Sequence, residues 1–162
     1  MRTFFSSLLL ILFLANVSLA HSVLYEDDTG HPLFRIRIPD GWAVSLDGDR
    51  VSIFPQTSGA FIEAWFLEGF EDEVEQGIYV KTLCETYFSE HELSAPEPVE
   101  LDSGLHGFLL NGRAKRDESW GEVRVLIFSP CTDSVCFSLQ FTPPSARDVP
   151  VLHRTVIERA HK

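Results

Sequence analysis

Alternating hydrophobic and polar positions predict a series of β-strands along the chain. Phe34, Ile36 and Ile38 are separated by two arginines, which is the pattern of a strand with one buried face. The same alternation runs through residues 135–141. Residues 61–67 are apolar on both faces, so both faces of that part of the sheet are expected to be covered. Four further strands are predicted over residues 42–44, 51–54, 106–114 and 122–128.

Two segments carry the periodicity of amphipathic helices. Residues 71–91 begin with acidic side chains, which the helix dipole favours in a first turn. The apolar stripe of this segment is Val74, Ile78, Val80, Leu83, Cys84, Tyr87 and Phe88. A second helix is predicted over residues 148–160, and residues 94–98 are predicted to be a linker. The order of strands, helix, strands and helix predicts an α+β fold in which two main helices pack against an antiparallel sheet.

A strand that runs into Pro-x-Gly-Trp, as residues 34–42 do, resembles the opening of the PsbP/DcrB-like domains of the Mog/PsbP fold family. The element order also resembles theirs over nearly all of residues 24–160. The resemblance implies an α-β-α sandwich, with a twisted antiparallel sheet flanked by two main helices. It also implies a role in protein binding and assembly rather than catalysis. No functional residue of the family is carried over to this chain, because fold alone does not transfer function.

The first 20 residues have the parts of a secretory signal peptide. Arg2 supplies an early positive charge, residues 8–14 form a short apolar core, and Ser18-Leu19-Ala20 offers small residues for cleavage. An uncleaved anchor is the alternative, but the apolar run is shorter than the about 20 residues that span a bilayer. No later segment is apolar enough to insert stably. We therefore expect one domain, residues 21–162, exported to the periplasm or secreted.

Composition and charge exclude several classes of function. Of 162 residues, 13 are Lys or Arg and 24 are Asp or Glu, which gives a net charge of -11, or -12 once Arg2 is removed. The hydrophobic fraction of 44% and the charged fraction of 23% are those of an ordinary globular domain. Nucleic-acid binding needs a basic footprint that this chain lacks. Anionic membranes are disfavoured for the same reason, whereas a cationic partner or metal ions are allowed.

The three cysteines are consistent with export. Cys131 and Cys136 bracket a four-residue connection between two predicted strands, so a disulfide between them is expected in an oxidising compartment. Their spacing has no matching Cys or His pair for zinc. Cys84 is predicted to be a buried, unreactive thiol on the apolar face of its helix. His91 lies two helical turns further on, roughly 10 Å away, which excludes a catalytic pair with Cys84.

Acidic clusters at residues 26–28, 47–49 and 68–75 are candidate cation sites, but none has the spacing of an EF-hand. The second is more simply a hairpin turn, and the third is more simply the solvated start of a helix. Nothing in the sequence brings two carboxylates together as a glycosidase requires. The motifs Gly-x-Ser-x-Gly, the phosphate-binding glycine loop and His-Glu-x-x-His do not occur. The sequence therefore predicts neither an enzyme nor a cofactor nor a metal site.

Trp120 follows a predicted hairpin turn and is a candidate contact residue for a protein partner, with packing over the sheet edge as the alternative. Trp42 and Trp65 are predicted to lie in the core. We therefore expect a non-catalytic domain that binds another envelope or extracellular protein. The alternatives are a periplasmic small-ligand or metal-binding module and an unrecognised enzyme. A pocket with convergent polar groups would favour these alternatives, whereas a filled interface with one exposed aromatic patch would favour protein binding.

Overall fold

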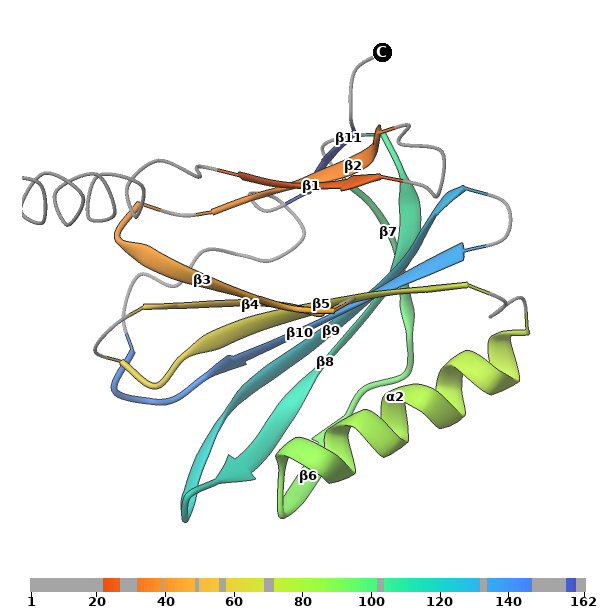
Figure 1. Ribbon diagram of the computed structural model, residues 1–162. Coiled ribbons are helices and arrows are strands. Elements are labelled where there is room, and N and C mark those ends of the chain that lie inside the picture. Colours follow the sequence, from red (N-terminus) through yellow and green to blue (C-terminus); the bar gives the residue numbers. More distant parts are fainter. Residues whose placement is uncertain are drawn as a thin grey trace, which may run out of the picture.

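The computed structural model describes residues 22–26, 32–38, 40–48, 50–55, 58–68, 72–101, 104–131, 134–146 and 157–159. Its elements form three layers, with a large sheet between a small sheet and helix α2 (Figure 1). The large sheet has the order β3-β4-β5-β10-β9-β8-β6, with β7 also paired to β8, and the small sheet has the order β1-β2-β11. The bounds are β1 Ser22–Glu26, β2 Pro32–Arg37, β3 Trp42–Asp47, β4 Arg50–Pro55, β5 Phe61–Glu68, α2 Glu73–Tyr87, β6 Glu90–Leu93, β7 Glu97–Glu100, β8 His106–Arg116, β9 Ser119–Cys131, β10 Ser134–Thr142 and β11 Ile157–Arg159.

The large sheet is antiparallel throughout the described residues, as the sequence predicts. One hydrophobic cluster lies between this sheet and α2, and includes Cys84, Val125 and Phe137. A second cluster lies between the two sheets, and includes Ile36, Ile62 and Leu126. The prediction that both faces of residues 61–67 are covered is therefore confirmed. Side chains of one strand alternate between the two clusters, which explains why the central strands are apolar on both faces.

The prediction of an α+β sandwich with two main helices is wrong. Strands make up 63% of the structure and helix 14%, so the fold is largely β. Residues 157–159 of the predicted second helix form strand β11, which pairs with β2, and residues 147–156 lie outside the described part of the chain. Two physical preferences favour the strand. Ile157 is β-branched, and a third strand satisfies backbone groups along the open edge of β2. A small sheet thus occupies the layer predicted for the second helix.

Helix α2 is shorter than the predicted 71–91. Asp72 caps its first turn, because its Oδ1 accepts a hydrogen bond from the Val74 N–H at 2.7 Å, and the helix ends where Phe88 becomes extended. Four predicted core positions are buried: Val80, Leu83, Cys84 and Phe88. Val74 and Ile78, in contrast, are 67% and 62% exposed. Ile78 and Val80 differ by two residues, or about 200° around a helix, so only one of them can face the sheet.

The predicted linker at residues 94–98 is partly a strand. Glu97–Glu100 forms β7, which pairs with β8 from Glu97 opposite Leu109 to Glu100 opposite His106. Pro98 lies within it, and a proline is tolerated there because β7 is an edge strand. Strand β6 pairs with the other half of β8, so two short strands share this edge of the sheet.

Candidate binding groove

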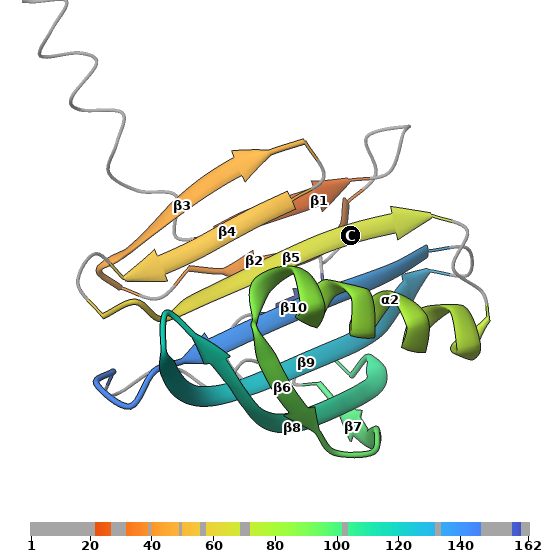
Figure 2. The same cartoon turned by 90° about the horizontal axis from the view of Figure 1, so that it is seen from below.

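A groove of about 690 Å³ lies on the α2 side of the large sheet, beside the helix. In Figure 2, α2 lies over β5 and β10 and leaves β3 and β4 uncovered. Four serines, three phenylalanines and three charged residues line it: Ser45, Ser52, Ser58, Ser119, Phe54, Phe61, Phe141, Glu63, Arg116 and Asp117. The groove therefore combines apolar rings with convergent polar groups, which is the usual composition of a ligand site.

The floor of the groove is a row of polar side chains on neighbouring strands. Ser45 of β3 pairs with Ser52 of β4, which pairs with Glu63 of β5. The next residue in this row is Leu139 of β10, which is fully buried. The row thus changes from polar to apolar between β5 and β10. These three residues lie on successive strands and share one surface because the strand register aligns them.

An aromatic wall with a cation completes the groove. The Phe61 and Phe141 rings lie 5.8 Å apart between centroids, and the Arg116 guanidinium lies 4.7 Å from the centroid of the Phe61 ring. Among the described residues, the ion-pair partner of Arg116 is Asp117, at 3.8 Å and with its side chain 93% exposed. An exposed pair at this distance is weak. Arg116 is therefore held in place while its N–H donors remain available to a ligand.

A partly buried hydrogen-bond network closes the groove on the helix side. The Tyr87 hydroxyl, at the end of α2, donates to Oε2 of Glu63. Nη1 of Arg50 donates to the Tyr87 oxygen at 3.5 Å, and Nη2 of Arg50 donates to Asp47 at 2.8 Å. Burial, together with the neighbouring Glu63, raises the pKa of Tyr87 to about 12. Tyr87 therefore keeps its proton at neutral pH and ties α2 to β5.

Two hairpin turns border the groove. Asp47 pairs with Arg50, and Gly48 has φ +59°, so the chain reverses here as the sequence predicts; Asp49 itself lies outside the described residues. Asp117 and Glu118 have φ values of 49° and 65°, between the paired Arg116 and Ser119. Positive φ at both central positions defines the turn that best matches the twist of two strands. This second turn places Asp117 at the mouth of the groove.

Trp120 lies away from the groove, on the opposite face of the sheet. It pairs with Lys115 and is 36% exposed. The Arg113 guanidinium lies 4.9 Å from the centroid of its ring, and Arg113 also forms an ion pair with Glu92 at 2.9 Å. The two tryptophans predicted to lie in the core, Trp42 and Trp65, are half-buried against the two core clusters. The sequence analysis proposed Trp120 as a contact residue and did not predict the groove. The serines that line the groove are single residues within strands, and no sequence motif marks them as a site.

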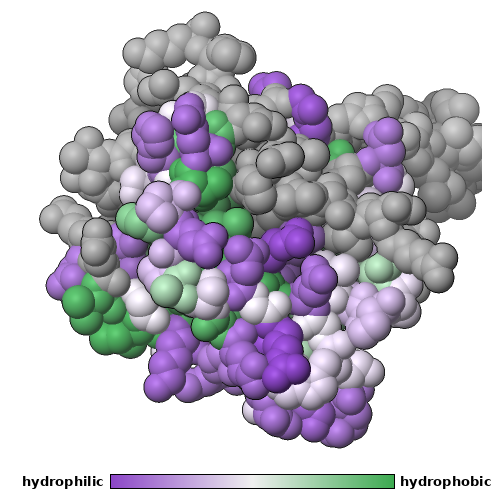
Figure 3. All heavy atoms as spheres, turned by 180° about the vertical axis from the view of Figure 1, so that it is seen from behind, coloured by the Kyte–Doolittle hydropathy of each residue, from purple (hydrophilic) through white to green (hydrophobic). Residues whose placement is uncertain are grey.

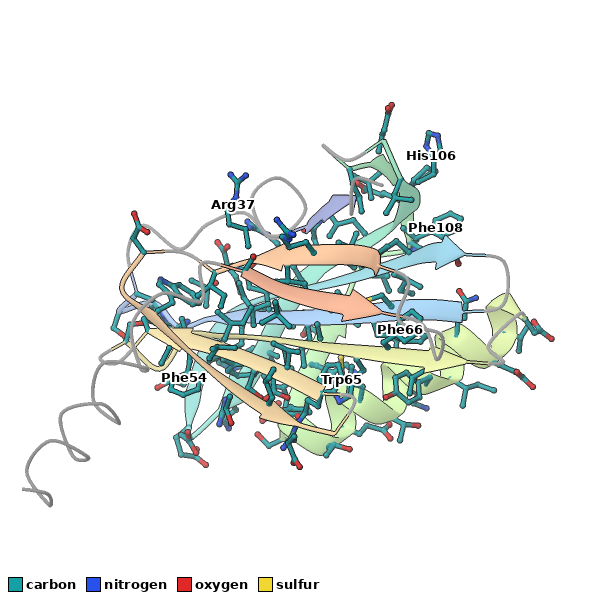
Figure 4. All side chains as sticks on the ribbon, turned by 45° about the horizontal axis from the view of Figure 1, so that its top comes forward. Arg37, Phe54, Trp65, Phe66, His106 and Phe108 are labelled. Atoms are coloured by element: carbon teal, nitrogen blue, oxygen red, sulfur yellow. The ribbon has the colours of Figure 1, made fainter. Side chains whose placement is uncertain are left out.

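A second hollow, of about 170 Å³, lies between α2 and β8 and is lined mainly by apolar side chains, including Val80, Pro96 and Phe108. Figure 3 shows a hydrophobic patch at the end of the molecule where α2 begins. Figure 4 shows Phe54 at the β3–β4 end of the molecule, far from Phe108 and His106 on β8. The two hollows are therefore separate, and the larger and more polar one is the candidate site.

The predicted Cys131–Cys136 disulfide is not formed in the structure. Cys131 pairs with Ser134, while Cys136 pairs with Phe128 after a shift in register. The two cysteines are therefore not cross-strand partners, and Cys136 is a free, fully buried thiol between the two sheets. Cys84 is also free and buried, as predicted, and burial raises its thiol pKa to about 11.

Both buried thiols are expected to resist modification in the folded protein. Because the thiolate is the reactive form and burial raises both pKa values, native Cys84 and Cys136 should react at least tenfold more slowly than in urea. Alkylation with iodoacetamide before and after unfolding, followed by peptide mapping, measures this. A peptide in which Cys136 remains joined to Cys131 without reductant would contradict the structure, and Cys136→Ser is the control.

Two further findings concern only the described part of the chain. No helix there is long and apolar enough to cross a membrane. No group of three or more His, Cys, Asp or Glu side chains is placed to hold a metal ion. Residues 27–28 of the first acidic cluster and residues 69–71 of the third lie outside the described residues.

Comparison with known proteins relates this chain to others by fold alone. No family model matches it, and no curated protein matches it. A solved structure from Bacteroides thetaiotaomicron superposes with a TM-score of 0.58 at 9% identity, over 88% of this chain and 49% of that chain. A Pseudomonas aeruginosa protein of unknown function gives a TM-score of 0.40 at 17% identity, over 77% and 85% of the two chains. This chain thus spans about half the length of the first, and the PsbP/DcrB-like resemblance stays a prediction.

Proposed function

We propose that the protein is an exported, non-catalytic binding module whose groove holds a small polar ligand with an acidic group. The observation that carries this proposal is the Arg116 guanidinium, stacked on Phe61 and lining a groove of about 690 Å³. Convergent polar groups in a pocket favour a small ligand over a protein partner. This is the small-ligand alternative that the sequence left open, and the polar lining of the groove supports it.

The groove offers three kinds of contact. Arg116 suits a carboxylate or phosphate group, because its planar fork can donate two parallel hydrogen bonds. Ser45 and Ser52 offer hydroxyl groups to the polar part of the ligand, and Phe54 offers an apolar surface that is 38% exposed. The net charge of the exported chain, -12 once Arg2 is removed from the full sequence of -11, opposes long-range attraction of an anion. Recognition would therefore depend on short-range hydrogen bonds inside the groove.

The hydrogen bonds around Glu63 support binding rather than catalysis. A serine nucleophile needs an adjacent base to remove its proton. The Glu63 carboxylate accepts the hydrogen bond of Tyr87 instead, and the raised pKa of Tyr87 keeps that proton in place. Oε2 of Glu63 thus serves to hold α2 against the groove.

Ligand binding is expected to depend on Arg116. The test is a thermal-shift screen with succinate, glutamate, inorganic phosphate and glucose 6-phosphate, followed by calorimetry of any compound that raises the melting temperature. Arg116→Gln should weaken binding at least tenfold, since it removes the cation that pairs with the acidic group. Arg113→Gln, on the opposite face of the same strand, is the matched control and should bind like the original protein. Equal binding by both variants, or no shift with any probe, would contradict the proposal.

Protein binding through Trp120 is the second candidate function. Trp120 is 36% exposed and lies on the face of the sheet opposite the groove. Exposed tryptophans are common anchors of protein interfaces. In this alternative the partner is another envelope or extracellular protein, and the groove plays no part.

A further inference from the structure

The free edge of strand β3 is the feature from which we infer a second interaction. Strand β3 ends the large sheet and pairs only with β4 among the described residues. An unpaired edge presents backbone N–H and C=O groups that can accept another strand. Most proteins protect such an edge with short strands, charges or proline.

The two edges of the large sheet differ in this protection. The edge opposite β3 consists of two four-residue strands, β6 and β7. Strand β6 contains Glu90 and Glu92, and β7 contains Pro98. Strand β3 is longer, and Asp47 at its end is its only charged residue. Leu46 of β3 is 65% exposed, the second highest value among the exposed large apolar residues of the described chain. Among the described residues, one edge is thus protected against strand addition and the other is not.

We propose that β3 pairs with β3 of a second copy in an antiparallel, two-fold symmetric dimer. Trp42, Val44 and Leu46 lie on one face of β3, since strand side chains alternate. With Val44 opposite Val44 of the second copy, each Trp42 lies opposite the other copy's Leu46. Each exposed leucine then gains an aromatic cross-strand neighbour, which is a stabilising type of pair.

The sequence of β3 favours this register over its neighbours. A shift of one residue would place the apolar face of one copy beside the polar face of the other. A shift of two residues would leave Leu46 or Trp42 without an apolar partner. In the proposed register Asp47 lies opposite Gly41 of the second copy, so the two carboxylates do not face each other. The pairing is therefore self-complementary, as a two-fold interface requires.

The dimer is expected to be weak and to depend on salt. One strand edge buries less than the about 1,200–2,000 Å² of a standard interface. Each exported copy also carries a net charge of -12, which is -11 for the full sequence less Arg2, so the copies repel each other at low ionic strength. Because salt screens this repulsion, the dimer fraction should rise with protein concentration and between 0.05 and 0.5 M NaCl.

Analytical ultracentrifugation of the exported chain tests the proposal with two matched variants. Leu46→Lys should weaken the dimer at least tenfold, even though the added positive charge reduces the general repulsion. Ile78→Lys makes the same charge change at a 62% exposed position on α2 and should leave the dimer intact. A monomer under all conditions would overturn the proposal. So would dimer loss in Ile78→Lys but not in Leu46→Lys, since this would place the interface on α2.

Cross-linking tests the register. In a Cys131→Ser background, Val44→Cys should form an intermolecular disulfide under mild oxidation, because the two positions meet at the two-fold axis. Ser45→Cys is the control and should cross-link at least tenfold less, because it lies opposite Ala43 of the other copy. Equal cross-linking of the two variants, or more from Ser45→Cys, would overturn this register.

Discussion

Replacement of Phe137 by Ala is expected to lower the free energy of unfolding by about 3–5 kcal/mol. Phe137 is fully buried in β10, between the large sheet and α2. Its ring lies 4.6 Å from that of Tyr79 on the helix. Truncation removes apolar area from the core and leaves a cavity that a sheet of paired strands cannot collapse to fill. The loss is a large share of a typical total stability of about 5–15 kcal/mol.

Urea unfolding followed by tryptophan fluorescence measures this effect. Phe54→Ala is the matched control, because Phe54 is 38% exposed and should cost about 1 kcal/mol or less. Similar decreases in the free energy of unfolding for the two variants would show that β10 does not lie between two layers. A loss for Phe137→Ala together with a native circular-dichroism spectrum would support the observed packing.

Gly112→Ala is expected to destabilise the protein by about 3 kcal/mol. A Cβ atom on Gly112 would clash with the backbone oxygen of Glu92 and lie 3.0 Å from Cα of Leu93. Both are backbone atoms, so no side-chain rotation can relieve the clash. Strand β6 would have to move away from β8 and give up their paired hydrogen bonds. Glycine is required here because the two backbones approach so closely.

Gly77→Ala is the control, and it should change the free energy of unfolding in the opposite direction. Gly77 lies within α2, and a Cβ atom there would meet nothing within 4 Å. Alanine should raise the stability by about 0.5–1 kcal/mol, because it restricts the unfolded chain and favours helix. Thermal and urea unfolding of the two variants measure both effects. If Gly112→Ala left the stability unchanged, β6 would not approach β8 as closely as the structure shows.

Local patterns predicted most of the strands correctly, because a half-buried strand needs alternation and a central strand needs two apolar faces. Arg35 and Arg37 are exposed while Ile36 and Ile38 are buried, as the alternation indicates. The same pattern could not show what covers the buried face. A helix was predicted for that layer, and the small sheet β1-β2-β11 occupies it. Pairing between distant segments, here residues 157–159 with β2, leaves little trace in local periodicity.

Strand register explains two errors of the sequence analysis: the predicted disulfide and the missed groove. The Cys131–Cys136 bridge was inferred from spacing, but the hairpin shifts its register between Ser134 and Cys136, and Cys136 faces the core. The groove was missed because Ser45, Ser52 and Glu63 are isolated polar residues in sequence. They form one surface only when three strands align. Arg116 joins them from a hairpin about 50 residues away, because β8 and β9 extend beyond α2.

The sequence by itself determined the antiparallel strands, the buried face of α2 around Cys84 and the turn at Gly48. Each of these depends on side chains close together in the chain: alternation, helical spacing or a residue that accepts positive φ. Only the tertiary structure decided which layers cover the sheet, which cysteines lie opposite each other and where a groove opens. Those outcomes depend on how strands pair and how layers pack, and the free energy of such contacts comes from burial and register rather than from local preference.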